Sequence, residues 1–170
     1  MPYTGTVPTF LAGELPDADK FTEITNFMNA MSGALTDYSA SFTITGSTTS
    51  PTKGSSTYSA GYRRVGKYIE YELGIVVGAG FSAGSGSYSY SVPVTASAGS
   101  FARATGAVWI NDSGTALRMG VMRFNTTTAL QIYMTDTASI GLLATLGSAG
   151  PGTAWATNDS FIAKIIYEAA

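Results

Sequence analysis

Alternation of apolar and polar residues along one stretch constrains the fold of this chain more than any other feature. In KYIEYELGIVV, residues 67–77, five apolar residues share one face: Ile69, Tyr71, Leu73, Ile75 and Val77. A period of two is that of a β-strand with one buried and one wet face. The preceding run from Tyr58 to Arg64 is a second strand, and Gly66 separates the two. The sequence therefore predicts a β-hairpin whose corner glycine adopts a positive φ.

Most of the chain after residue 37 resembles this hairpin in pattern. Further short strands are predicted at 38–44, 88–92, 105–110, 117–124, 129–134 and 161–167, separated by turn-rich runs such as NDSG, NTTT and GSAGPGT. SIGLLATLG, residues 139–147, fits either a strand or a short helical turn. We expect a mainly β fold, an antiparallel β-sandwich of jelly-roll type over residues 38–170.

Two segments precede this domain. Three prolines in residues 1–16 break regular structure and predict an extended arm, in which the anchoring residues are expected to be Tyr3, Val7, Phe10 and Leu11. Residues 17–36 begin with two aspartates that favour a helix start. Apolar residues then recur at spacings of 3, 4, 3 and 4, namely at Phe21, Ile24, Met28, Met31 and Leu35.

This spacing leaves two interpretations of the helix open. It forms a narrow seam of the kind through which two or three copies of a helix meet around an axis. It also fits a single amphipathic helix that packs on its own domain, with Phe27 widening the apolar face. About 2.5 heptads are fewer than a coiled coil usually has.

Composition excludes several functional classes. Only 12% of the 170 residues are charged and the net charge is −2, so the chain lacks the positive field that attracts nucleic acid. It has neither Cys nor His, which removes disulfides, thiolate and imidazole catalysis, and zinc sites built on these ligands. No run of about 18 apolar residues occurs. We expect no nucleic-acid partner, no membrane insertion, no cofactor and no catalytic residues.

The remaining candidates for chemistry are few. Glu70 and Glu72 share a strand face, and we favour a solvated face that balances Arg63, Arg64 and Lys67 over a catalytic pair. Asp112, Asp136 and Asp159 fit turn caps, and no EF-hand spacing supports a calcium site. Four aromatic residues are candidates for stacking on sugars, with half or more expected in the core: Tyr88, Tyr90, Trp109 and Trp155.

Several runs together resemble a known family. SAGYRRVGKYIEYELGIVVGAG, then GSGSYSYSVPVTAS and finally GTAWATNDSFIAKIIYEA follow the order found in the β-rich domain of bacteriophage virion appendages. These are minor tail proteins, tail-fibre or receptor-binding tips, and head fibres, especially of phages that infect actinobacteria. The resemblance covers about residues 57–170. FLAGELPDADKFTEITNFMNAM is more loosely similar to their N-terminal segment, because Asp-Ala-Asp-Lys-Phe-Thr stands where many of them carry Trp-Asn.

The resemblance implies a non-enzymatic structural protein of the virion, commonly a trimer, anchored by its N-terminal part. Its partners would be other virion proteins, further copies of itself and a host cell-surface glycan or protein. The N-terminus has no secretion-signal pattern, so we expect assembly in the host bacterial cytoplasm. A minor tail or receptor-binding protein is the favoured interpretation. A capsid decoration protein or head fibre is the alternative, and a carbohydrate-binding module, with contacts at Tyr88, Tyr90 and Trp155, is a third.

Overall fold

The computed structural model describes residues 18–99, 104–135, 143–151 and 154–170. A helix, α1 (Ala18–Ser32), comes first and is followed by ten strands. The strands are β1 (Thr36–Asp37), β2 (Ile44–Gly46), β3 (Thr57–Val65), β4 (Tyr68–Val76), β5 (Tyr88–Ser91), β6 (Thr105–Asp112), β7 (Ala116–Thr126), β8 (Ala129–Thr135), β9 (Leu143–Thr145) and β10 (Ser160–Glu168).

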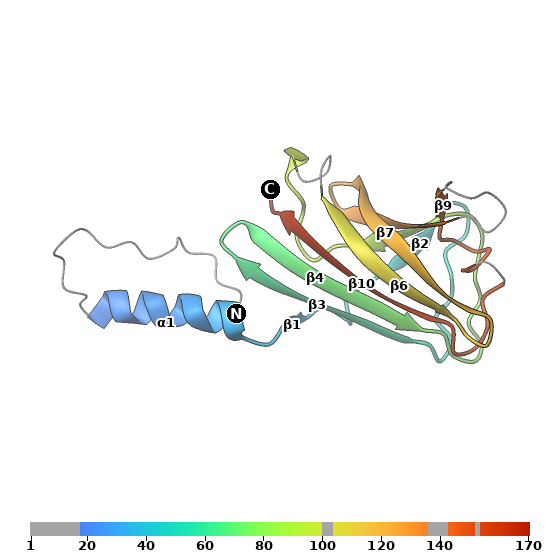
Figure 1. Ribbon diagram of the computed structural model, residues 1–170, viewed down its shortest axis with the longest axis horizontal. Helices are drawn as coiled ribbons and strands as arrows, with labels where there is room; N and C mark the ends of the chain where they lie inside the picture. Colours follow the sequence, from blue (N-terminus) through green and yellow to red (C-terminus); the bar gives the residue numbers. More distant parts are fainter. Residues whose placement is uncertain (1–17, 100–103, 136–142, 152–153) are drawn as a thin grey trace.

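The strands form one antiparallel sheet that curls around a shared core. Their order is β1-β3-β4-β10-β6-β7-β8-β5-β2, with β9 paired to β8. The strand β10 lies between β4 and β6 and joins them into one sheet. Figure 1 shows the curled sheet as one body and α1 projecting from one end of it. The predicted mainly β, antiparallel, sandwich-like fold with one short helix is confirmed.

The hairpin predicted from the alternating stretch is present. β3 and β4 pair along their whole length, from Thr57 opposite Val76 to Val65 opposite Tyr68. Gly66 occupies the two-residue turn between them with a φ of 59°. That conformation is in the left-handed region, which glycine adopts without the steric cost that a Cβ imposes. The corner glycine therefore has the role that the sequence predicts.

The core is rich in aromatic side chains that come from the inner face of the curled sheet. Tyr71 and Tyr90 are fully buried, and Phe161 is 2% exposed. The rings of Tyr90 and Phe161 meet edge to face, with centroids 5.5 Å apart. Tyr71 donates a hydrogen bond from its hydroxyl to the Ser91 carbonyl at 3.0 Å, so its polar end is satisfied inside the core.

Two predictions near the start of the domain are wrong in part. The run 38–44 is not one strand: the Ser41 and Phe42 amides both donate to the Tyr38 carbonyl, which makes a turn, and β2 begins only at Ile44. Tyr38 and Phe42 still pack on the core, because the turn keeps both rings on the inner side. The helix ends at Ser32 rather than 36, since the chain then runs into β1. The predicted arm, residues 1–16, lies outside the described residues.

Within the parts of the chain that the structure describes, no helix has both the length and the apolar character that crossing a membrane requires.

Candidate functional site

A row of apolar side chains crosses the outer face of the sheet. Strand alternation directs Ile162 of β10 away from the core, opposite Gly74 of β4 and Trp109 of β6. Trp109 in turn lies opposite Met119 of β7. The side chains of Ile162, Trp109 and Met119 are 67%, 46% and 64% exposed. These three residues form a ridge, called the apolar ridge below, over three neighbouring strands.

Beside the apolar ridge the same face is built from small residues. Ser59 of β3 lies opposite Gly74, and Gly61 lies opposite Glu72 of β4. Leu35, in the segment after α1, packs over Gly61: a Cβ added to this glycine would lie 3.1 Å from the Cβ of Leu35. The apolar ridge on one side and Leu35 on the other enclose an open groove of about 630 Å³. The groove is therefore a consequence of small residues on β3 and β4 next to large ones on β10, β6 and β7.

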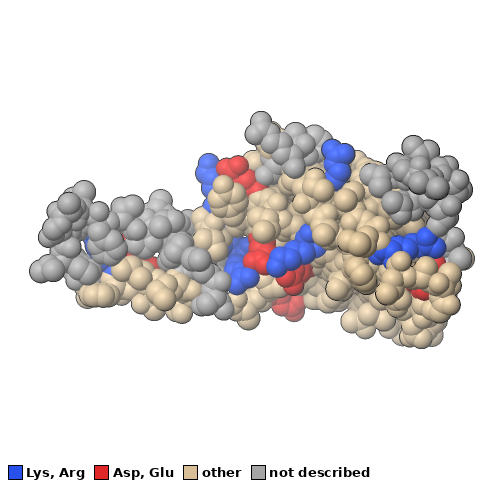
Figure 2. Space-filling model, viewed as in Figure 1, with Lys and Arg blue, Asp and Glu red and all other residues tan. Residues whose placement is uncertain are grey.

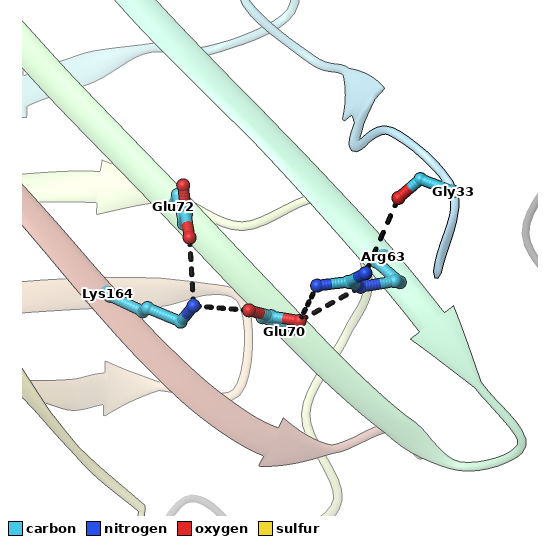
Figure 3. Close-up of polar contacts among 5 residues, drawn as sticks. All are labelled: Gly33, Arg63, Glu70, Glu72 and Lys164. Atoms are coloured by element: carbon cyan, nitrogen blue, oxygen red, sulfur yellow. Dashed lines mark hydrogen bonds and ion pairs between the residues drawn. The ribbon is translucent and has the colours of Figure 1, made fainter. Parts of the chain in front are cut away.

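Four charged side chains make a ladder at the edge of this groove (Figure 3). Arg63 of β3 donates from Nη2 and Nε to one oxygen of Glu70, at 2.6 and 2.9 Å. Lys164 of β10 pairs with the other oxygen of Glu70 and, at 2.9 Å, with Glu72. Arg63 also donates to the carbonyl of Gly33 at 3.4 Å, which ties the ladder to the segment after α1.

The contacts within this ionic ladder favour the charged forms of Glu70 and Lys164. The hydrogen bond from Lys164 lowers the pKa of Glu70, and Arg63 adds to this, while partial burial acts in the opposite direction. Hydrogen bonds to Glu70 and Glu72 raise the pKa of Lys164. Both oxygens of the Glu70 carboxylate are occupied by cations, which favours a structural role for the two glutamates over an acid–base pair.

Of the three basic residues expected to balance the two glutamates across the hairpin, only Arg63 does so. Arg63 pairs with Glu70, as the sequence suggests, but Lys67 pairs with Glu168 and Arg64 donates to the carbonyl of Gly66. Lys164 was missed, because nothing in a single sequence indicates that β10 lies beside β4. Figure 2 shows charged groups gathered over β3, β4 and β10 near the middle of one face, with mostly uncharged surface around them.

Two of the three candidates for glycan contact, Tyr88 and Tyr90, are not at an accessible surface. Tyr90 is fully buried and Tyr88 is 2% exposed, so the expectation that these rings contact a sugar is wrong. Burial raises the pKa of Tyr88 to about 12, in keeping with its place in the core. Trp155 is half-buried, stacks on Tyr88 and donates from its indole nitrogen to the Gly147 carbonyl at 2.8 Å. Of the four aromatic candidates, Trp109 has the exposed ring.

The predicted seam residues separate into two groups. Phe21, Ile24 and Met28 lie on α1, and Phe21 and Met28 are 57% and 61% exposed. Met31 also lies on α1, but its side chain is outside the described part. Leu35 does not belong to the helix, because α1 ends three residues earlier and Leu35 packs on β3 instead. The anchoring residues Tyr3, Val7, Phe10 and Leu11 lie outside the described residues.

The aspartate predicted to cap the turn before the last strand does so. Asp159 is fully buried and accepts hydrogen bonds from the amides of Ala156, at 2.7 Å, and Ser113, at 2.9 Å. Asp112 is also buried and pairs with Arg118 at 3.7 Å. Asp136 lies outside the described residues. In the described part of the chain, no group of three His, Cys, Asp or Glu side chains is placed to hold a metal ion.

Comparison with protein-family models, curated proteins and solved structures gives no match to this chain. The groove, the apolar ridge and the exposed side of α1 are the features of the described residues from which a mode of binding can be inferred. An exposed apolar row beside charges that are already paired is suited to contact with another apolar surface, since it offers little to a charged ligand.

Proposed function

We propose that this chain is a non-enzymatic structural protein of a phage particle, a minor tail or receptor-binding appendage. It assembles as a homotrimer through α1, attaches to other virion proteins by residues 1–16 and presents its β domain outward. The order of sequence runs that resembles virion appendages supports the class of protein. The projecting helix supports the mode of assembly.

The observation that carries the assembly proposal is the exposure of two of the predicted seam residues, Phe21 and Met28. Phe21 and Met28 lie two helical turns apart on one side of α1, and both remain more than half exposed. A helix that packs on its own domain buries its apolar side, whereas α1 projects from the end of the sheet (Figure 1). Association of two further copies of α1 along this side would remove both side chains from water.

The double substitution Phe21→Asp/Met28→Asp, called the seam variant below, tests assembly. We expect the unmodified protein to sediment as a trimer and the seam variant to sediment as a monomer, because six carboxylates would otherwise meet at the axis. The matched control is Thr22→Asp/Asn26→Asp, which adds the same charge to the opposite side of the same helix and should leave the trimer intact. A monomeric unmodified protein, or a seam variant that stays trimeric, would refute assembly through α1.

Labelling of intact phage particles with an antibody against the β domain tests the location. We expect label at the tail, and loss of this label when residues 1–16 are deleted, with the deleted protein still trimeric. Label over the capsid shell would replace the tail assignment by that of a decoration protein or head fibre. Particles without label would overturn the virion assignment, and particles that retain the deleted protein would overturn attachment through residues 1–16.

A further inference from the structure

We propose that a second copy of this chain covers the groove, so that the sheet face with the apolar ridge is an interface between β domains. This inference rests on the proposed homotrimer and adds a second interface, on the β domain, to the one formed by α1. Ile162, Trp109 and Met119 are large apolar residues held in register on adjacent strands, and Ile162 and Met119 are about two thirds exposed. Contiguous exposed apolar side chains of this kind mark interaction surfaces in proteins.

The shape of the face is suited to a neighbouring copy. A ring of three copies needs heterologous contacts, in which one patch of each copy meets a different patch of the next. This face offers both patches: a ridge over β10, β6 and β7, and beside it a hollow floored by Ser59, Gly61 and Gly74. A rotation can therefore place the apolar ridge of one copy in the hollow of the next.

The charges on this face also favour an identical partner. The ionic ladder contains two cations and two carboxylates, all paired within the chain, so that it sums to zero. Two such faces can meet without net repulsion between their ladders. Both cations of each ladder are already paired with carboxylates, so the ladder is poorly suited to binding a phosphate or an anionic glycan.

The position of the groove links it to the helix. Leu35, which walls the groove, follows the end of α1 by three residues, and Arg63 of the ladder donates to the carbonyl of Gly33 in the same connection. In Figure 1 the strands β4, β10 and β6 are seen face-on while α1 lies along the plane of the view. An axis parallel to α1 is therefore also parallel to this face, and copies related by such an axis on the groove side of the sheet bring their groove faces together.

Single cysteines provide the test, because the chain has no cysteine of its own. Ile162→Cys and Met119→Cys place a thiol on the apolar ridge, and Thr128→Cys, in the exposed turn between β7 and β8, is the control. Each is made in the unmodified background and in the seam variant. The readout is the rate of labelling by a bulky maleimide at the protein concentration at which the trimer is measured.

In the trimer we expect both ridge thiols to react at least about tenfold more slowly than in the seam variant, since the reagent reaches them only when the interface opens. The control thiol should react at the same rate in both backgrounds. Ridge thiols that react equally fast in both backgrounds, in a protein that sediments as a trimer, refute the interface and leave assembly through α1 standing. If the unmodified protein is a monomer, the proposed assembly itself fails. Fast ridge labelling in the trimer that neutral oligosaccharides slow down would make the groove a glycan site instead.

Discussion

Replacing Asp159 by Ala should lower the free energy of unfolding by about 2–5 kcal/mol, because two hydrogen bonds to a buried charge are lost together. One carboxylate oxygen accepts from the Ala156 amide and the other from the Ser113 amide. The first closes the turn before β10, and the second joins this turn to the one between β6 and β7. The substitution therefore frees two turns that hold neighbouring strands. Urea unfolding at one fixed protein concentration measures the effect.

The control separates loss of the two hydrogen bonds from loss of a negative charge. Asp19→Ala removes the same charge from the exposed first turn of α1, away from the β domain, and should leave the unfolding midpoint of the domain nearly unchanged. Asp159→Asn is expected to fall between the two, because its amide keeps one acceptor and turns a donor toward a backbone amide. If Asp159→Ala lies within about 0.5 kcal/mol of the unmodified protein, the two hydrogen bonds do not hold the turns together.

Local patterns in the sequence were enough to predict the elements that depend on local chemistry. The β3–β4 hairpin follows from a period of two on both sides of a glycine that accepts a positive φ. The start of α1 at Ala18 follows from the aspartates near it and from the apolar spacing that begins at Phe21. The end of α1 could not be predicted in this way. Leu35 continues the apolar spacing in the sequence, but in the structure its side chain packs on Gly61 of β3.

The candidate site depends on contacts that a single sequence does not contain. Alternation in TGAVWIND defines two faces of β6 but does not say which is buried, since Val108 and Ile110 on one face and Trp109 on the other are all apolar. In the structure Val108 and Ile110 are buried and Trp109 is exposed. β6 pairs with β10 on one side and β7 on the other, and the inner faces of the three strands together cover the core. The apolar ridge and the ionic ladder both require β10 beside β4 and β6, a pairing between distant parts of the chain.

The packing of Phe161 against Tyr90 leads to the second large expected effect. Phe161→Ala should lower the free energy of unfolding by about 3–5 kcal/mol, as is typical when a buried aromatic ring is removed and leaves a cavity. The side chain is 2% exposed, its ring meets that of Tyr90 edge to face, and it lies on β10, the strand that joins β4 to β6. A cavity here has rigid strands on both sides, which limits how far the site can collapse. Urea unfolding is again the measurement.

Tyr90→Phe, on the other ring of the same pair, distinguishes packing from polarity. The Tyr90 hydroxyl is buried and has no hydrogen-bond partner among the described residues, and burial raises the pKa of this group well above its usual value. Removing the hydroxyl keeps the ring and its edge-to-face contact but relieves an unsatisfied polar atom, so stability should stay the same or rise. A loss in Tyr90→Phe comparable to that in Phe161→Ala would mean that the hydroxyl, and not ring packing, stabilises this part of the core.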